Sequence, residues 1–179
     1  MKYPFCLLLI CSCFLLHAQN DHDPLIDDII CHEQEKATML MEAEHYRNYA
    51  ADQTDMVYQE MHWEVDPAVI HIKGLITYHF KSRVNQLTSL VLDLANTMQV
   101  HYVKRGDTDL AFVHSNDKLL TIDLGKTLSI GEYDSLTISY EGTPLSTGLG
   151  SFLQTMHNGH PLIETESVPY GVRDWWPGK

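Results

Sequence analysis

The sequence predicts an all-β fold, either an antiparallel β-sandwich or a large bent sheet, preceded by a short N-terminal helix. From Met56 onward the period of the hydrophobic residues changes from about 3.6 to about 2. Turn-forming Asp, Asn, Gly and Pro residues separate the alternating runs, and no helical period lies between them. Short strands with turns at this spacing are typical of sandwiches.

The first expected element is a helix from about Pro24 to about Arg47. Asp23 can cap its first turn, and Pro24 suits the first helical position. Apolar residues then recur at helical spacing. Residues 48–55 have no clear period, so we expect them to link the helix to the β region.

The longest alternating run is Ile70–Phe80. Its even positions carry Ile, Tyr and Phe, whereas His71, Lys73 and His79 lie opposite, so one face is expected to be buried. The expected strands are Val57–Val65, Ile70–Phe80, Leu87–Leu94, Gln99–Lys104, Leu110–His114, Lys118–Leu124 and Leu136–Glu141. Gly125 is expected to form a turn. Residues 146–160 are glycine-rich and then polar, and are expected to form a loop.

The amino-terminal residues have the features of a secretory signal peptide. A positive end precedes an apolar run from Phe5 to Leu16, and Ala18 is a small residue before polar ones. This run is too short for a stable transmembrane anchor. We therefore expect export to the periplasm or the outside, with lipid attachment at Cys13 as the alternative. The expected division is a signal peptide at 1–18, a helical leader and linker at 19–54, and a β domain at 55–179.

The composition excludes several classes of protein. The chain has 24 Asp+Glu and 12 Lys+Arg, a formal charge of -12, so nucleic acid is not an expected partner. A hydrophobic content of 44% argues against a disordered chain. Without residues 1–18 the only cysteine is Cys31, so no intramolecular disulfide is possible and the fold depends on its core.

Eleven histidines suggest a search for a metal site, but the spacing does not support one. His32-Glu33 begins like the helical His-Glu-x-x-His motif, but Lys36 occupies the position of the second histidine. His157 and His160 would need a third ligand from elsewhere. The sequence also lacks a nucleophile elbow, a phosphate-binding loop and a dinucleotide-binding loop. The residues therefore predict no catalytic residue and no metal ligand in this chain.

Three blocks in order carry a resemblance to a known family. Residues 165–179 resemble a signature that runs Thr-Gln-x-Glu-Pro, then a small residue and Arg, then an aromatic followed by Pro-Cys. Residues 63–69, with Gly74 and Tyr78, are similar to the opening strand pair of the same family, and residues 128–144 form the third block. The family is that of the aminopeptidase N and leukotriene hydrolase zinc peptidases, and the tail is most similar to exported bacterial members.

The resemblance implies the N-terminal β domain of a zinc aminopeptidase, which releases amino-terminal residues from peptides. The chain stops before the family's Gly-Ala-Met-Glu-Asn loop and His-Glu-x-x-His helix. We therefore expect a fragment that binds no zinc and is inactive alone, although the full-length protein would hold zinc. The implied partners are the missing catalytic domain and a peptide substrate, with this domain as one wall of the cleft.

The resemblance also implies roles for residues of the tail. Glu166, in the Thr-Gln position, would bind the free amino group of the substrate. Arg173 would hold the loop by bidentate hydrogen bonds. Trp175 and Trp176 would pack against the following domain, and Pro177 belongs to the signature.

Two departures and two alternatives stand beside this interpretation. Val168 stands where the signature has Glu, and Gly178 where it has Cys. The alternative function is a non-catalytic β-sandwich for binding or scaffolding, since relatives can keep the architecture and lose the zinc site. A lectin-like site is a third possibility, but it needs coplanar aromatics, and adjacent Trp175 and Trp176 would face opposite ways in an extended chain.

Overall fold

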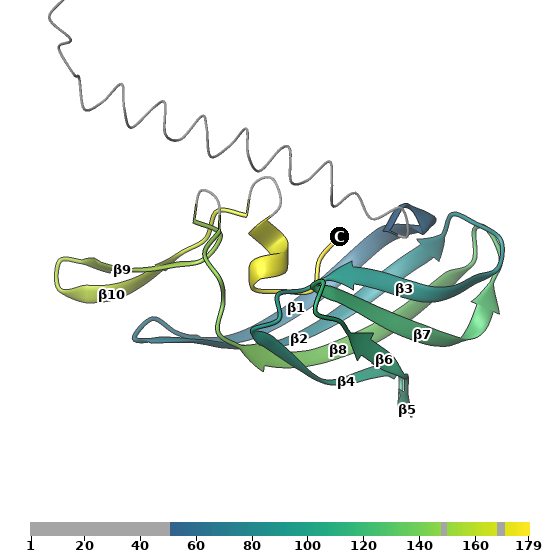
Figure 1. Cartoon of the computed structure of the whole chain (residues 1–179), viewed down its shortest axis with the longest axis horizontal. Helices are drawn as coiled ribbons and strands as arrows, with labels where there is room; N and C mark the ends of the chain where they lie inside the picture. The colour runs from purple at the N-terminus through teal and green to yellow at the C-terminus, as the bar shows by residue number, and fades with distance from the viewer. Residues whose placement is uncertain (1–50, 148–149, 168–170) are drawn as a thin grey trace, which may run out of the picture.

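The computed structural model describes residues 51–147, 150–167 and 171–179. In this part, the chain forms ten β-strands and two short 3-10 helices (Figure 1). The expected signal peptide and the helix expected over Pro24–Arg47 lie outside the described residues. No helix in the described part is long and apolar enough to cross a membrane. The elements are η1 (Ala51–Gln53), β1 (Thr54–Asp66), β2 (Val69–Ser82), β3 (Leu87–Asp93), β4 (Met98–Arg105), β5 (Thr108–Asp109), β6 (Phe112–His114), β7 (Leu119–Leu128), β8 (Tyr133–Gly142), β9 (Leu153–His157), β10 (His160–Glu164) and η2 (Gly171–Asp174).

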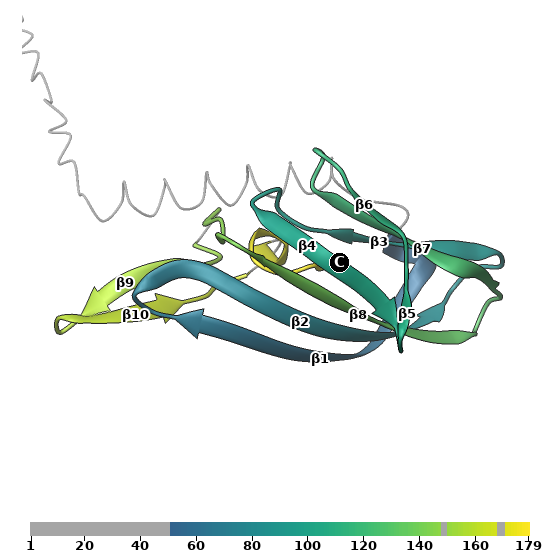
Figure 2. The same cartoon turned by 90° about the horizontal axis from the view of Figure 1, so that it is seen from below.

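The strands form two packed antiparallel sheets and a hairpin. The large sheet has the order β1-β2-β8-β4-β5, and the small sheet has the order β3-β7-β6. Figure 2 shows that the large sheet is curved and that the small sheet covers only part of its concave side. The β9–β10 hairpin extends at the opposite end from the small sheet (Figures 1 and 2). The predicted antiparallel sandwich is confirmed.

The alternation of β2 explains how the large sheet obtains its buried face. Ile72, Ile76, Tyr78 and Phe80 are each at most 1% exposed, as the even-numbered pattern predicts. Ile70 departs from this pattern and is 45% exposed, because β2 begins at the β1–β2 turn, beyond the edge of the small sheet.

Both sheets contribute side chains to one core. The large sheet supplies residues of β2, β4 and β8, and the small sheet supplies leucine and isoleucine from β3 and β7. Complete burial of each such side chain contributes about 1.5–3 kcal/mol, before the cost of ordering the chain. The fully buried members of the small sheet include Leu90, Leu92, Leu120, Ile122 and Leu124.

The prediction of a turn at Gly125 was wrong. This glycine has a φ of 58°, but β7 continues through it to Leu128. The register between β3 and β7 shifts in this region, where Leu87 pairs with Leu128 and Ser89 pairs with Asp123. The extra residues of β7 form a bulge, and a glycine with positive φ is suited to a bulge as well as to a turn.

The prediction of one strand over Leu110–His114 was also wrong. The chain passes here from the large sheet to the small one, so β5 ends at Asp109 and β6 begins at Phe112. Leu110 remains buried, and its N–H donates to the carbonyl of Val103 at 2.8 Å. The alternation of apolar and polar residues therefore continues through Leu110, although the chain leaves the large sheet and joins the small one at this point.

The loop expected over residues 146–160 instead includes β9 and the start of β10. His157 and His160 pair across a two-residue turn, whose Asn158 and Gly159 have φ values of 51° and 82°. Two positive φ values are typical of a type I′ turn, and Asn-Gly is its preferred sequence. The strands are only five residues long and half polar, so their alternation was too weak to stand out.

Candidate functional site

All the predicted site residues lie in the tail, residues 165–179, which follows β10 and includes η2. The tail occupies the concave side of the large sheet that the small sheet leaves uncovered (Figure 2). At its end, Gly178 forms a bridge with Asp93 of β3. The N–H of each residue donates to the carbonyl of the other, at 2.9 and 2.7 Å. The tail therefore extends the edge of the small sheet and joins the two layers.

Two buried tyrosines of the large sheet hold the backbone of the tail. The hydroxyl of Tyr78 donates to the carbonyl of Pro177. The hydroxyl of Tyr140 donates to the carbonyl of Trp175 at 3.0 Å and accepts the indole N–H of Trp63 at 3.0 Å. Burial raises the pKa of both tyrosines, so both stay neutral donors at physiological pH.

Gly74 makes room for this network. It pairs with Trp63 on one side and with Tyr140 on the other. A Cβ at this position would lie 2.3 Å from the nearest ring carbon of Tyr140. Only glycine leaves room for the Tyr140 ring at this position, which explains why the apolar face of β2 is interrupted by a glycine.

The aromatic residues of the tail pack on the chain's own core. The ring centroids of Trp63 and Trp175 are 4.9 Å apart, those of Trp63 and Trp176 are 6.2 Å apart, and those of Phe152 and Trp175 are 5.7 Å apart. Both tail tryptophans are half-buried against the core cluster. Trp63 therefore covers part of both tail tryptophans and Phe152 covers part of Trp175, whereas the expected packing of the two tryptophans against a following domain stays a prediction.

Glu166 is exposed, but the backbone around it is anchored on both sides. Its N–H donates to the carbonyl of Gly150 at 3.4 Å. The hydroxyl of the next residue, Ser167, accepts the indole N–H of Trp175 at 2.9 Å, and its carbonyl accepts the N–H of Gly171 at 3.2 Å. The structure therefore exposes this carboxylate to solvent, while the described backbone of Glu166 and Ser167 is hydrogen-bonded to other parts of the chain.

Asp174 is a buried carboxylate that sequence reasoning missed. It has no exposed surface, and its Oδ2 accepts hydrogen bonds from the hydroxyls of Thr147 and Ser151 and from the N–H of Thr147. Nothing in the sequence separates it from the many solvated acids, because its partners lie more than twenty residues away. Its position in the signature-like tail was the only available signal.

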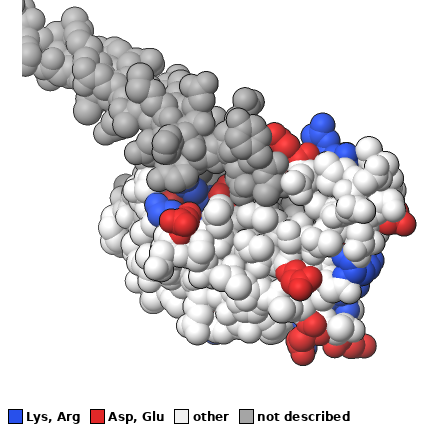
Figure 3. Space-filling model, turned by 45° about the vertical axis from the view of Figure 1, so that its right-hand side comes forward, with Lys and Arg blue, Asp and Glu red and all other residues white. Residues whose placement is uncertain are grey.

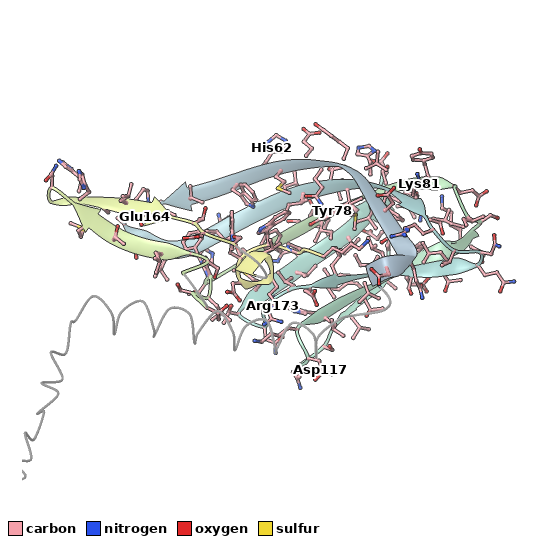
Figure 4. All side chains as sticks on the ribbon, turned by 90° about the horizontal axis from the view of Figure 1, so that it is seen from above. His62, Tyr78, Lys81, Asp117, Glu164 and Arg173 are labelled. Atoms are coloured by element: carbon pink, nitrogen blue, oxygen red, sulfur yellow. The ribbon has the colours of Figure 1, made fainter. Side chains whose placement is uncertain are left out.

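Arg173 lies in η2, on the concave side of the large sheet, whereas His62 and Lys81 project from the convex side (Figure 4). Its carbonyl accepts the N–H of Ala95 at 2.7 Å. Burial raises the pKa of Asp93, and the nearby charge of Arg173 offsets part of that increase. The predicted role of the guanidinium in hydrogen bonding stays a prediction.

The histidines are dispersed over the described part of the chain. His71 and His101 both approach Glu141, at 3.8 and 3.4 Å, and His79 stacks near the ring of Tyr58. No group of three His, Cys, Asp or Glu residues among the described residues could hold a metal ion. The residues that the structure describes therefore offer no site that fits a zinc ion.

Charged side chains of both signs are interspersed on the face of the molecule shown in Figure 3. Several are paired across strands, and the strongest group is at Asp134, whose side chain is 5% exposed. Arg105 contacts both oxygens of this carboxylate, and Lys126 lies 3.3 Å away. This network holds β4, β7 and β8 together and is structural.

Comparisons with known proteins identify the fold. No protein-family model and no curated protein sequence matches the chain. An M1 zinc metallopeptidase from Deinococcus radiodurans matches 70% of this chain at 26% identity with a TM-score of 0.59, and the match covers 29% of its own length. A mutant of the enzyme from the same organism, bound to a Tyr-Ser-Ala substrate, matches the same share at 24% identity with a TM-score of 0.61. Yeast LTA4 hydrolase matches 71% of this chain at 16% identity with a TM-score of 0.57, over 21% of its length.

This β domain has the fold of part of the M1 zinc metallopeptidases. The chain thus corresponds to less than a third of these enzymes.

Packing around residue 178 explains why a glycine stands there. The signature that the tail resembles has a small residue before its arginine and a cysteine after its proline, where this chain has Val172 and Gly178. A Cβ at position 178 would lie 2.1 Å from Cγ1 of Val172. The larger side chain at 172 therefore fills the space that a side chain at 178 would need. The other departure, Val168, lies outside the described residues.

Proposed function

We propose that this chain is the N-terminal β domain of an exported zinc-dependent aminopeptidase, and that it forms one wall of the substrate cleft. The observation that carries the proposal is the fold shared with M1 zinc metallopeptidases, together with a tail that presents Glu166 to solvent. One of these enzymes binds a Tyr-Ser-Ala substrate. A short peptide with a free amino end is therefore the substrate class that we propose here.

Glu166 supplies the recognition of the amino end. An exopeptidase must distinguish a free ammonium group from an internal amide, and a carboxylate does so by a charge-assisted hydrogen bond. The anchored backbone on both sides of Glu166 limits the entropy lost on binding, because little of the loop remains to be ordered.

On this proposal, zinc is held by the catalytic domain of the longer polypeptide and not by this chain. The described residues hold no group that fits the ion, so no step of the reaction is assigned to a metal held by this chain. The contribution of the chain is to bind and orient the substrate. On this proposal the chain alone, purified as the 179-residue product, binds no stoichiometric zinc and does not hydrolyse a leucyl or alanyl chromogenic amide.

The test uses the longer polypeptide that, on this proposal, contains the chain and a catalytic domain. Turnover of Leu-p-nitroanilide is compared for the wild type, Glu166→Gln and the control Glu164→Gln, an exposed acid at the end of β10 (Figure 4). A hydrogen bond to a charged group contributes about 1.5–3 kcal/mol, so Glu166→Gln should lower kcat/KM by roughly tenfold to a hundredfold. The control should change it by less than about twofold. An equal effect of the two substitutions would contradict the assignment of Glu166.

The alternative, a non-catalytic binding module, predicts a different result. The longer polypeptide would then bind free-amine peptides without hydrolysing them, and its sequence would lack the second histidine of His-Glu-x-x-His. Export is tested separately: the mature protein from the periplasm or medium should begin at Gln19, and recovery of the uncleaved chain in the cytoplasm would contradict it.

A further inference from the structure

We propose that Asp174 is a positioning residue for substrate binding, which holds the backbone of Glu166 in place through Ser151 and Gly150. This inference rests on the proposed function, because it concerns how the amino-end contact is held. It assigns a role to a carboxylate that is fully buried and that faces no substrate.

The geometry begins with the hydrogen bonds at Asp174. Its Oδ2 accepts three hydrogen bonds. The donors are the hydroxyl of Thr147, the hydroxyl of Ser151 and, at 3.2 Å, the N–H of Thr147. The carbonyl of Asp174 also accepts the N–H of Leu145 at 3.0 Å. Side chain and backbone together therefore fasten the segment after β8 to η2. Ser151, like Asp174, has no exposed surface.

From Ser151 the path to Glu166 is short. The carbonyl of the preceding Gly150 accepts the N–H of Glu166. Gly171 packs against the same place, since a Cβ on it would lie 2.5 Å from Cβ of Ser151 and 3.5 Å from the carbonyl oxygen of Glu166. The space beside Gly171, between Ser151 and the carbonyl of Glu166, thus has no room for a side chain. We therefore expect a displacement of Ser151 to shift the backbone of Glu166, which is hydrogen-bonded to the preceding Gly150.

The second anchor of the loop comes from the next residue of η2. Trp175 donates its indole N–H to Ser167, so consecutive residues, Asp174 and Trp175, hold the two sides of Glu166. The backbone is fixed on both sides, whereas the carboxylate of Glu166 remains exposed. This is the arrangement expected of a binding group supported by a surrounding layer of buried residues.

The other oxygen of Asp174 indicates that stability alone does not explain the residue. Its Oδ1 is buried and has no hydrogen-bond partner among the described residues. A buried polar atom without a partner costs stability, and such atoms are rare in folded proteins. Asparagine has the same shape and one carbonyl oxygen for the three donors, so Asp174→Asn should keep the fold. Because Asp174→Asn retains these hydrogen bonds, it should also retain the KM that Asp174→Ala loses.

The experiment is a double-mutant cycle in the longer polypeptide, read as KM and kcat for Leu-p-nitroanilide. Glu166→Gln should raise KM about tenfold or more, as the proposed function requires. Asp174→Ala should raise KM roughly threefold to thirtyfold with kcat within about twofold, and Asp174→Asn should restore most of the loss. In the double variant, Asp174→Ala should add less than about twofold to the effect of Glu166→Gln, because it acts through that residue.

Two further variants separate positioning from simple loss of stability. Ser151→Ala removes one donor to Asp174 and should raise KM in the same direction while the protein stays folded. Asp134→Asn weakens the buried ion-pair network at the other end of β8 and should lower the melting temperature without changing KM. If Asp174→Ala does not fold, Ser151→Ala takes its place in the cycle with Glu166→Gln, and Asp174→Asn is the control that should leave KM nearly unchanged.

The outcomes distinguish this inference from the proposed function. No effect of Glu166→Gln would overturn both. If Glu166→Gln raises KM tenfold and Asp174→Ala raises KM by the same factor in the double variant as it does alone, the two residues act independently. That result would overturn the role of Asp174 and leave the proposed function standing. An unchanged KM in both Asp174→Ala and Ser151→Ala would overturn it as well.

Discussion

Replacing Gly74 with alanine should detach the tail from the large sheet. The new Cβ would lie 2.3, 2.4 and 2.6 Å from Cε1, Cζ and the hydroxyl oxygen of Tyr140, far inside contact distance. The ring of Tyr140 must therefore move, and it cannot do so without losing its bonds to Trp63 and Trp175. Overpacking costs about 1–3 kcal/mol, and each lost hydrogen bond costs about 0.5–1.5 kcal/mol net. The substitution should lower the free energy of unfolding by roughly 2–6 kcal/mol.

The chain supplies its own probe for this measurement. Its three tryptophans, Trp63, Trp175 and Trp176, all belong to one cluster, so near-UV circular dichroism and fluorescence report tail docking directly. Urea unfolding of Gly74→Ala is compared with Lys73→Ala, an exposed neighbour on the opposite face of β2, which should change stability by less than about 0.5 kcal/mol. If Gly74→Ala unfolds within about 0.5 kcal/mol of the wild type with an unchanged near-UV spectrum, Tyr140 does not need the space at position 74 to hold the tail.

Three further predictions concern the same tail. Gly178→Cys should destabilise the protein by about 1–3 kcal/mol through the contact with Val172, and Val172→Ala should relieve most of this loss; additive urea midpoints would contradict the compensation. Tyr78 and Tyr140 should resist ionisation in an ultraviolet titration until the chain unfolds. Their pKa values are raised by burial, so the stability they contribute is present below the ordinary value of 10.0 and is lost as the pH rises above it; reversible ionisation of all nine tyrosines near pH 10 in the folded chain would contradict this. The pKa of Asp93 is also raised by burial, so its contribution to stability is present below 3.8 and is lost as the pH rises through the higher folded pKa. As the pH rises above 3.8, the free energy of unfolding of Asp93→Asn should therefore increase relative to that of the wild type. A difference in free energy of unfolding that stays constant between pH 3 and pH 7 would contradict this prediction.

The sequence was most informative where one face of a strand is buried and the other is solvated. The alternation from Ile72 to Phe80 identified β2 and its buried side, because a side-chain period of two leaves little choice of face. It was least informative where pairing changes partners, as at Leu110. It also failed at the short hairpin around Asn158-Gly159, whose turn signal was stronger than the alternation of its strands.

The tail shows why a site is harder to predict than a strand. Its resemblance to a family signature drew attention to Glu166 and Arg173, but not to how they are held. The contacts that hold the tail come from residues far away along the chain, such as Trp63, which local pattern cannot pair with Trp175. Burial of Asp174 likewise depends on tertiary packing, since an aspartate in a polar tail has no local sign of being inaccessible.

Recognition of the substrate's amino end by Glu166 is tested most directly by comparing Glu166→Gln with Glu164→Gln in the longer polypeptide, measured as kcat/KM on a substrate with a free amino end. We expect kcat/KM to fall by roughly tenfold to a hundredfold in Glu166→Gln and by less than about twofold in Glu164→Gln. Equal kcat/KM values for the two variants, or a longer polypeptide without aminopeptidase activity, would contradict it.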